Sequence, residues 1–108
     1  MKIRALDLLK GGKKLGRAVY KVKGGKLIKV QLTSEDKKIK SIKIMGDFFL
    51  HPEEVIDDIE QTLEGHLLDE QELSRLIREV LASKKAVSLG VSPEDFARCI
   101  MMAGEKNE

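Results

Sequence analysis

The sequence contains few of the residues on which catalytic and metal sites are commonly built. Its 108 residues include one cysteine, Cys99, two histidines, four aromatic residues and no tryptophan. A single cysteine excludes an internal disulfide and any site made of several thiolates, iron–sulfur clusters included. His51 and His66 have no cysteine or carboxylate at ligand spacing, so they predict no metal site. No nucleophile is paired with a base, and we therefore expect no catalytic residue.

Long hydrophobic runs are also missing. No run approaches the ~20 apolar residues that a membrane span needs. Residues 1–9 are too short and too charged for a signal peptide. Together with the lone cysteine, these observations favour a cytoplasmic protein without a membrane contact. The length of 108 residues and the hydrophobic content of 42% predict one globular domain.

Charge is distributed unevenly along the chain. Residues 1–45 contain fourteen Lys/Arg and three Asp/Glu, whereas residues 46–108 contain six Lys/Arg and fifteen Asp/Glu. The net charge of +2 therefore conceals a basic half and an acidic half. A basic surface indicates an anionic partner, such as phosphate, nucleic acid or an acidic protein surface. A lysine-rich sheet face that only contacts solvent explains the same pattern.

The period of the hydrophobic residues changes from two to 3.6 near Met45. Before this point, alternation predicts strands over residues 17–23, 27–33 and 39–45. Directly opposed residues of two paired strands point to the same face of the sheet. Because the apolar positions are even-numbered, they must oppose one another, and the residue numbers of each opposed pair must have an even sum. A three-residue loop at 23–25 pairs Tyr20 with Ile28, and a five-residue turn at 34–38 pairs Val30 with Ile42. The outer face of this antiparallel meander then carries Arg17, Lys21, Lys23, Lys29 and Lys43.

Three helices follow in the acidic half. Pro52 suits the first position of a helix with Val55, Ile56, Ile59 and Leu63 on its apolar side, and Gly65 suits its end. Asp69 with Glu72 resembles a capping box and opens a second helix, and residues 92–95 open a third. We therefore predict an α+β fold, a three-stranded antiparallel meander with helices packed on one face. Residues 1–16 form a basic N-terminal connector, and residues 17–108 form the domain.

One segment, residues 46–54, combines a glycine, two adjacent phenylalanines and a proline. Adjacent residues in a strand or helix do not share a face, so Phe48 and Phe49 should not be equally buried. We expect one of them to pack between sheet and helix and the other to serve an interface. That both rings simply close the sheet–helix corner remains an equal alternative.

The sequences Tyr20-Lys21-Val22-Lys23-Gly24-Gly25-Lys26-Leu27 and Gly46-Asp47-Phe48-Phe49-Leu50-His51-Pro52-Glu53-Glu54 resemble the C-terminal accessory domain of lipoate–protein ligases. Gly90-Val91-Ser92-Pro93-Glu94-Asp95-Phe96-Ala97 is similar to the closing helix of that domain. The resemblance covers about residues 20–103. It implies the fold shared with iron–sulfur scaffold proteins, whose cluster-binding cysteines are absent here.

The resemblance implies a separate small subunit, because the chain has no room for the catalytic domain. Its partner would be the catalytic subunit of the ligase, which adenylates lipoate with ATP and Mg and transfers the lipoyl group to a lysine of an acceptor protein. No cofactor is expected to bind this chain alone. Candidate interface or cleft-closing residues are Lys23, Gly24, Gly25, Lys26, Gly46, Asp47, Phe48, Phe49 and His51.

A charged surface adds to this expectation from the residues themselves. We expect Arg17, Lys21, Lys29 and Lys43 to complement an acidic patch on the partner. The alternative function is a stand-alone module that binds nucleic acid or another polyanion through the same face. Nucleic acid is disfavoured, because stacking platforms need aromatic residues among the lysines and Tyr20 is predicted on the covered face.

Overall fold

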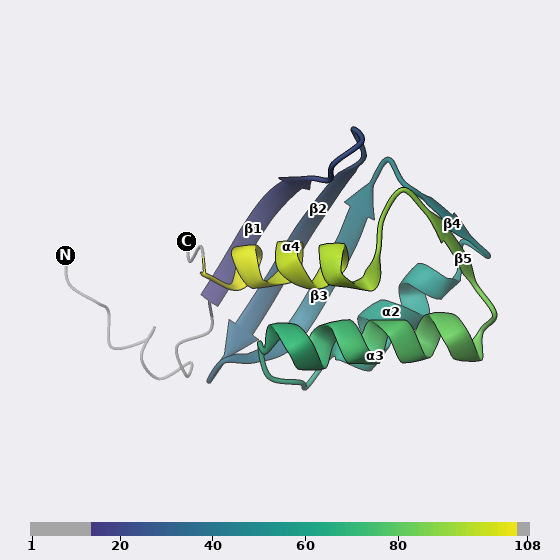
Figure 1. Cartoon of the computed structure of the whole chain (residues 1–108). Helices are drawn as coiled ribbons and strands as arrows, with labels where there is room; N and C mark the ends of the chain where they lie inside the picture. Colours follow the sequence, from purple (N-terminus) through teal and green to yellow (C-terminus); the bar gives the residue numbers. More distant parts are fainter. Residues whose placement is uncertain (1–13, 106–108) are drawn as a thin grey trace, which may run out of the picture.

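The computed structural model describes residues 14–105, which form two layers (Figure 1). The larger sheet has the order β1-β2-β3, and a separate two-stranded sheet pairs β4 with β5. The strands are β1 (Lys14–Lys21), β2 (Leu27–Glu35), β3 (Lys38–Gly46), β4 (Phe49–His51) and β5 (Val87–Leu89). The helices are α2 (Val55–Leu63), α3 (Glu70–Ser83) and α4 (Pro93–Glu105). The predicted α+β meander with helices on one face is confirmed.

The core lies between the larger sheet and the helices. Alternate residues of the strands point into it, and Ile28, Val30 and Leu32 of β2 are almost fully buried. Opposite them, α4 crosses the sheet (Figure 1) and buries Phe96, Cys99 and Ile100. The apolar side chains at every second position of the strands and those on one side of each helix therefore pack together in one apolar layer.

The first hairpin has the predicted register. Tyr20 pairs with Ile28 and Ala18 with Val30, and Tyr20 packs against the core as expected. The Val22 N–H donates to the Lys26 carbonyl at 2.8 Å, which leaves the predicted three-residue loop at 23–25. Within the loop, Gly24 and Gly25 have φ values of +102° and +99°. β1 begins at Lys14, three residues earlier than predicted, and residues 1–13 of the expected connector lie outside the described residues.

The second hairpin corrects the predicted register. Val30 pairs with Ile44, not with Ile42, because the turn has two residues in place of five. Asp36 and Lys37 form this turn with φ values of +56° and +63°. A two-residue turn alone would mix the two faces, but the register shifts between Thr33 and Ser34 and leaves Lys40 without an opposed residue. This bulge returns the apolar side chains of β3 to the covered face.

Two of the three described helices begin as predicted. Asp69 accepts hydrogen bonds from the Gln71 and Glu72 N–H groups at 3.1 and 3.4 Å. Ser92 and Asp95 form a reciprocal cap, in which the Ser92 N–H donates to Asp95 Oδ2 at 2.9 Å and the Asp95 N–H to Ser92 Oγ at 3.2 Å. Among residues 14–105 we find no helix that is both long and apolar enough to span a membrane.

The first helix starts later than predicted. α2 begins at Val55, and residues 52–54 form a turn in which the Pro52 carbonyl accepts from the Val55 N–H at 3.1 Å. The reason is β4, an element that the sequence did not predict, which ends at His51 immediately before Pro52. Residues 52–54 are therefore used to redirect the chain from strand to helix.

Both ends of the described chain lie at the same end of the larger sheet. Lys14 pairs with Ser34, next to the β2–β3 turn. Glu105, at the end of α4, lines a hollow together with Lys37 of that turn. β4 and β5 lie at the other side of the molecule (Figure 1).

Candidate partner-binding site

The β1–β2 hairpin tip and the residues after β3 form one continuous surface. The Leu27 N–H donates to Asp47 Oδ1 at 2.6 Å, and the Asp47 N–H donates to the Leu27 carbonyl at 3.1 Å. Gly46 makes this close approach possible, because a Cβ at that position would lie 2.1 Å from the Leu27 carbonyl oxygen. Two groups of predicted site residues, the tip at 23–26 and the corner at 46–49, are thus brought together.

The two phenylalanines of this corner have different environments. Phe48 is half-buried, and its ring centroid lies 5.1 Å from that of Phe96 at an interplanar angle of 88°. Phe49 is 48% exposed. Its ring lies nearly parallel to that of His51, with 6.3 Å between centroids. The predicted division, with one ring inside and one outside, is what the structure shows, and the role of Phe49 in an interface stays a prediction.

β5 adds residues that sequence reasoning missed. Phe49 pairs with Leu89 and His51 with Val87, so these four side chains share one face of the small sheet. Val87 is 49% exposed and Leu89 is 57% exposed. We call this set (Phe49, His51, Val87 and Leu89) the β4–β5 patch. The only sequence signal was the alternation around Ser88, which is too short to predict a strand or its partner.

The loop after β5 joins the patch to the hairpin tip. A Cβ on Gly90 would lie 2.7 Å from Cγ of Lys26, so the aliphatic part of the lysine passes directly over this glycine. The tip, the corner and the patch therefore form one side of the molecule. Phe49, His51 and Met45 also line a hollow of about 340 Å³ between β3, β4 and the start of α2.

The outer face of the larger sheet is basic, as predicted, but it is not purely polar. Arg17, Lys21, Lys29 and Lys43 are all exposed there, and we call them the basic face. Lys29 lies between Val19 on β1 and Met45 on β3, which are 54% and 42% exposed. Within residues 14–105, the three lysines of this face form no salt bridge. Their charge is therefore available to a partner.

The arginines of the helical layer, in contrast, have carboxylate partners. Arg75 contacts Glu72 at 2.5 Å and Glu79 at 2.6 Å, and Arg98 contacts Glu70 at 3.1 Å. The hydrogen bond to Glu72, followed by the charges of Glu72 and Glu79, raises the pKa of Arg75. These pairs are exposed, so each contributes little to stability. The paired arginines are therefore not available to an anionic partner, unlike the lysines of the basic face.

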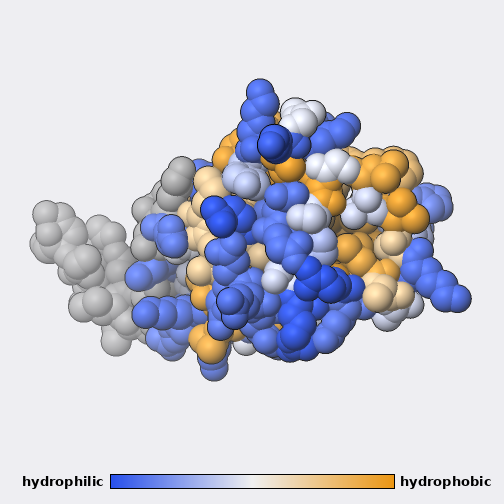
Figure 2. All heavy atoms as spheres, viewed as in Figure 1, coloured by the Kyte–Doolittle hydropathy of each residue, from blue (hydrophilic) through white to orange (hydrophobic). Residues whose placement is uncertain are grey.

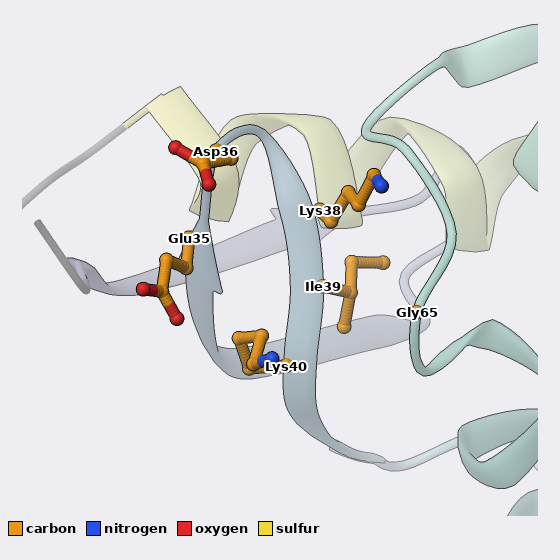
Figure 3. Close-up of a pocket in the computed structure, with 6 residues that line it drawn as sticks. All are labelled: Glu35, Asp36, Lys38, Ile39, Lys40 and Gly65. Carbon is orange, nitrogen blue, oxygen red and sulfur yellow. The ribbon is translucent and has the colours of Figure 1, made fainter. Parts of the chain in front are cut away.

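A second hollow, of about 360 Å³, lies beside the β2–β3 turn. Figure 3 shows that Glu35 and Asp36 point to one side of the turn and Lys38 to the other. The charged groups therefore do not converge on a common point, as a small-molecule site requires. This hollow lies at the end of the sheet opposite to the hairpin tip.

The remaining residues with reactive side chains are separated from one another. Cys99 is buried in α4, and its sulfur contacts the carbonyl oxygens of Ala18 at 3.7 Å and Ile28 at 3.5 Å. His51 belongs to the patch, and His66 lies at the end of the α2 segment, where its carbonyl accepts from the Ile39 N–H. In the part of the chain that the structure describes, no three His, Cys, Asp or Glu side chains are grouped to hold a metal ion.

The fold defines a class of small two-layer α+β domains. The candidate site of this domain is the exposed corner at residues 46–49, directly after β3. The chain belongs to the family described as the bacterial lipoate protein ligase C-terminus, whose model matches residues 20–100. It is 36% identical over 81 residues to lipoate-protein ligase A subunit 2 of Thermoplasma acidophilum, which covers 75% of this chain and 82% of that protein.

A solved structure supports the same assignment. It is from an archaeal lipoylation system of Thermoplasma acidophilum, which comprises a bipartite lipoate protein ligase and its E2 lipoyl domain. The similarity has a TM-score of 0.71 with 32% sequence identity, and it covers 82% of this chain and 96% of the matched chain.

Proposed function

We propose that this chain is the accessory subunit of a split, two-chain lipoate–protein ligase in the cytoplasm. It forms a heterodimer with a separate catalytic subunit and is required for the ATP-dependent activation of lipoate to lipoyl-adenylate. The observation that carries the proposal is the 36% identity to a chain that is itself subunit 2 of such a ligase. The near-complete coverage of the matched solved chain supports it, because that chain comes from a structure of a bipartite lipoate protein ligase and its E2 lipoyl domain.

The chain supplies no catalytic group to the reaction; it supplies a rigid surface that contacts the catalytic subunit. Lipoate and ATP with Mg are substrates of the assembled ligase, and the catalytic subunit holds them. The corner at 46–49 is fixed by the Asp47–Leu27 hydrogen bonds and the Phe48–Phe96 contact. A rigid surface of this kind can close a cleft, exclude water and fix the loops of a partner in the reactive arrangement. Binding then favours the active conformation of the catalytic subunit by a shift in population.

The proposal is tested by following pyrophosphate release from ATP in the presence of lipoate. The lipoate carboxylate attacks the α-phosphorus of ATP, and pyrophosphate leaves as lipoyl-adenylate forms. We expect release when this chain is mixed with the catalytic subunit from the same source, and none with either protein alone. If the two proteins form a complex and pyrophosphate release does not exceed that of the catalytic subunit, the accessory role is wrong.

A second candidate function is a module that binds polyanions through the basic face. The absence of salt bridges to its lysines among residues 14–105 favours this function. The aromatic residues argue against nucleic acid, because Tyr20 packs on the covered side and Phe49 lies in the β4–β5 patch. A polyanion module would bind RNA with an affinity that falls steeply as salt rises.

Reversing the charge of the basic face should slow the association of the two subunits. We expect Lys21→Glu, Lys29→Glu and Lys43→Glu together to lower the association rate constant roughly 10-fold at low salt and to weaken its salt dependence. The reason is that these lysines attract an acidic patch on the catalytic subunit. Stopped-flow mixing at several salt concentrations measures both effects.

The matched control has the same change in net charge elsewhere on the surface. Lys14→Glu, Lys37→Glu and Lys38→Glu alter exposed lysines at the end of the sheet beside the β2–β3 turn, outside the basic face and away from β4 and β5. Association that is equally slow in both triple variants would show that only net charge matters. Unchanged association in the first variant would remove the basic face from the interface.

A further inference from the structure

We propose that the β4–β5 patch is the contact that holds the catalytic subunit, and that it binds an apolar surface with an acidic border on that subunit. This inference rests on the proposed function and specifies where the two chains meet. The patch includes Val87 and Leu89, which lie outside the segments that suggested an interface from sequence. The argument begins from where the exposed apolar side chains of this molecule lie.

These side chains are concentrated on one side. Six large apolar residues are exposed in the described range 14–105, and three of them, Phe49, Val87 and Leu89, belong to the patch. A fourth, Met45, lines the same hollow as Phe49. Figure 2 shows hydrophobic surface on the side of the molecule where β4 and β5 lie. Singly exposed apolar residues are ordinary, whereas a contiguous group marks a binding surface.

The patch is not an unfinished part of the core. The opposite face of the same small sheet is already packed, because Leu50 is buried and Ser88 is half-buried. Ser88 Oγ also donates to the Val91 carbonyl at 3.2 Å. Phe49, Val87 and Leu89 therefore lie on the outer face of a completed layer, and their exposure does nothing for the stability of the isolated chain.

The patch is also held in place before a partner arrives. Phe48, next to Phe49, packs edge-to-face on Phe96. The Asp47 side chain is fixed to the backbone of Leu27, and Lys26 passes over Gly90 directly after β5. A surface that is already ordered loses little conformational entropy on binding, so its apolar contacts convert efficiently into affinity. Aromatic and aliphatic anchors in such a setting are typical of binding hot spots.

The surroundings of the patch specify the chemistry of the partner. Met45 lines the hollow beside Phe49 and, on the outer face of the sheet, is opposed to Lys29. The patch is therefore continuous with the basic face, whose lysines form no salt bridge within the described residues. Glu53 also lines the hollow, so the complementary surface is apolar and carries its carboxylates on the side that faces Lys29. The two-part ligase of the relatives supplies the reason to assign that surface to a non-identical chain.

The test compares two exposed apolar positions of the patch with a third outside it. The double variant Phe49→Ser, Leu89→Ser should bind the catalytic subunit more weakly. We expect its dissociation constant, measured by isothermal titration calorimetry, to rise at least about 30-fold. Leu67→Ser is the matched control, because Leu67 is 53% exposed but pairs with Lys38 beside the β2–β3 turn. Its dissociation constant should stay within about twofold of that of the unmodified chain.

A second measurement does not depend on substitution. Hydrogen exchange of the unmodified chain should slow at residues 49–51 and 87–89 when the catalytic subunit is added. An unchanged dissociation constant in the double variant, or no protection of these strands in the complex, would overturn the contact. Dimers of this chain that disappear in the double variant would assign the patch to self-association instead. If the unmodified chain fails to bind the catalytic subunit at all, the proposed function itself is wrong, and the contact with it.

Discussion

Gly46→Ala is expected to destabilise the domain by at least about 3 kcal/mol, through steric overlap and backbone strain together. Gly46 has φ +154°, and a Cβ there would lie 2.1 Å from the Leu27 carbonyl oxygen and 2.8 Å from the ring of Phe48. Backbone cannot move away as the end of a long side chain can. Relief of the overlap would therefore break the pairing of Leu27 with Asp47 or displace Phe48 from Phe96.

Urea unfolding followed by circular dichroism measures this loss. Gly25→Ala provides the control, because Gly25 also has a positive φ, +99°, but no atom lies within 4 Å of a Cβ there. We expect the control to lose only about 1 kcal/mol, the cost of an L residue in a left-handed conformation. Equal losses in the two variants would show that conformation alone, and not the approach of Leu27, requires glycine at position 46.

Phe96→Ala should cost about 3–5 kcal/mol, a large part of the ~5–15 kcal/mol that stabilises a typical domain. Phe96 is fully buried in α4 and supports the ring of Phe48 from below the corner. Its loss leaves a cavity between helix and sheet and removes the edge-to-face contact. We therefore expect a lower urea midpoint and weaker binding of the catalytic subunit in the same variant.

Phe49→Ala should weaken binding as well, but without the loss of stability. Its ring is 48% exposed, so the unfolding free energy should change by less than about 1 kcal/mol while the affinity for the catalytic subunit falls. The pair of variants separates a residue that supports the surface from one that makes the contact. A Phe96→Ala protein as stable as the unmodified chain would contradict the placement of this ring at the centre of the core.

The first hairpin shows how far local sequence rules extend. Even-numbered apolar residues and two glycines at 24–25 leave one register that keeps Tyr20 and Ala18 on the covered face, and the structure has it. The same parity rule accepts Ile42 or Ile44 opposite Val30. The choice between them depends on Asp36 and Lys37 adopting left-handed conformations without glycine and on the bulge at Lys40. Neither feature has a strong sequence signature.

The small sheet marks the limit of such reasoning for the candidate site. β4 and β5 have three residues each and are separated by two helices in the sequence. Three residues are too few to show a period. The pairing of β4 with β5 depends on how α2 packs against β3 and on how α3 packs against α2 and α4. The half of the site in residues 46–51 was therefore found from its unusual composition, whereas Val87 and Leu89 were not found.

Lys14 and Glu105 both lie near the β2–β3 turn, away from the β4–β5 patch. A label or a surface tether joined at Lys14 or at Glu105 therefore leaves the proposed contact open to solution. Immobilised in this orientation, the chain presents the hairpin tip, the corner and the patch to a partner flowing past it. In a fusion protein, for the same reason, the chain between Lys14 or Glu105 and the catalytic subunit must be long enough to run the length of the domain before the two contact surfaces can meet.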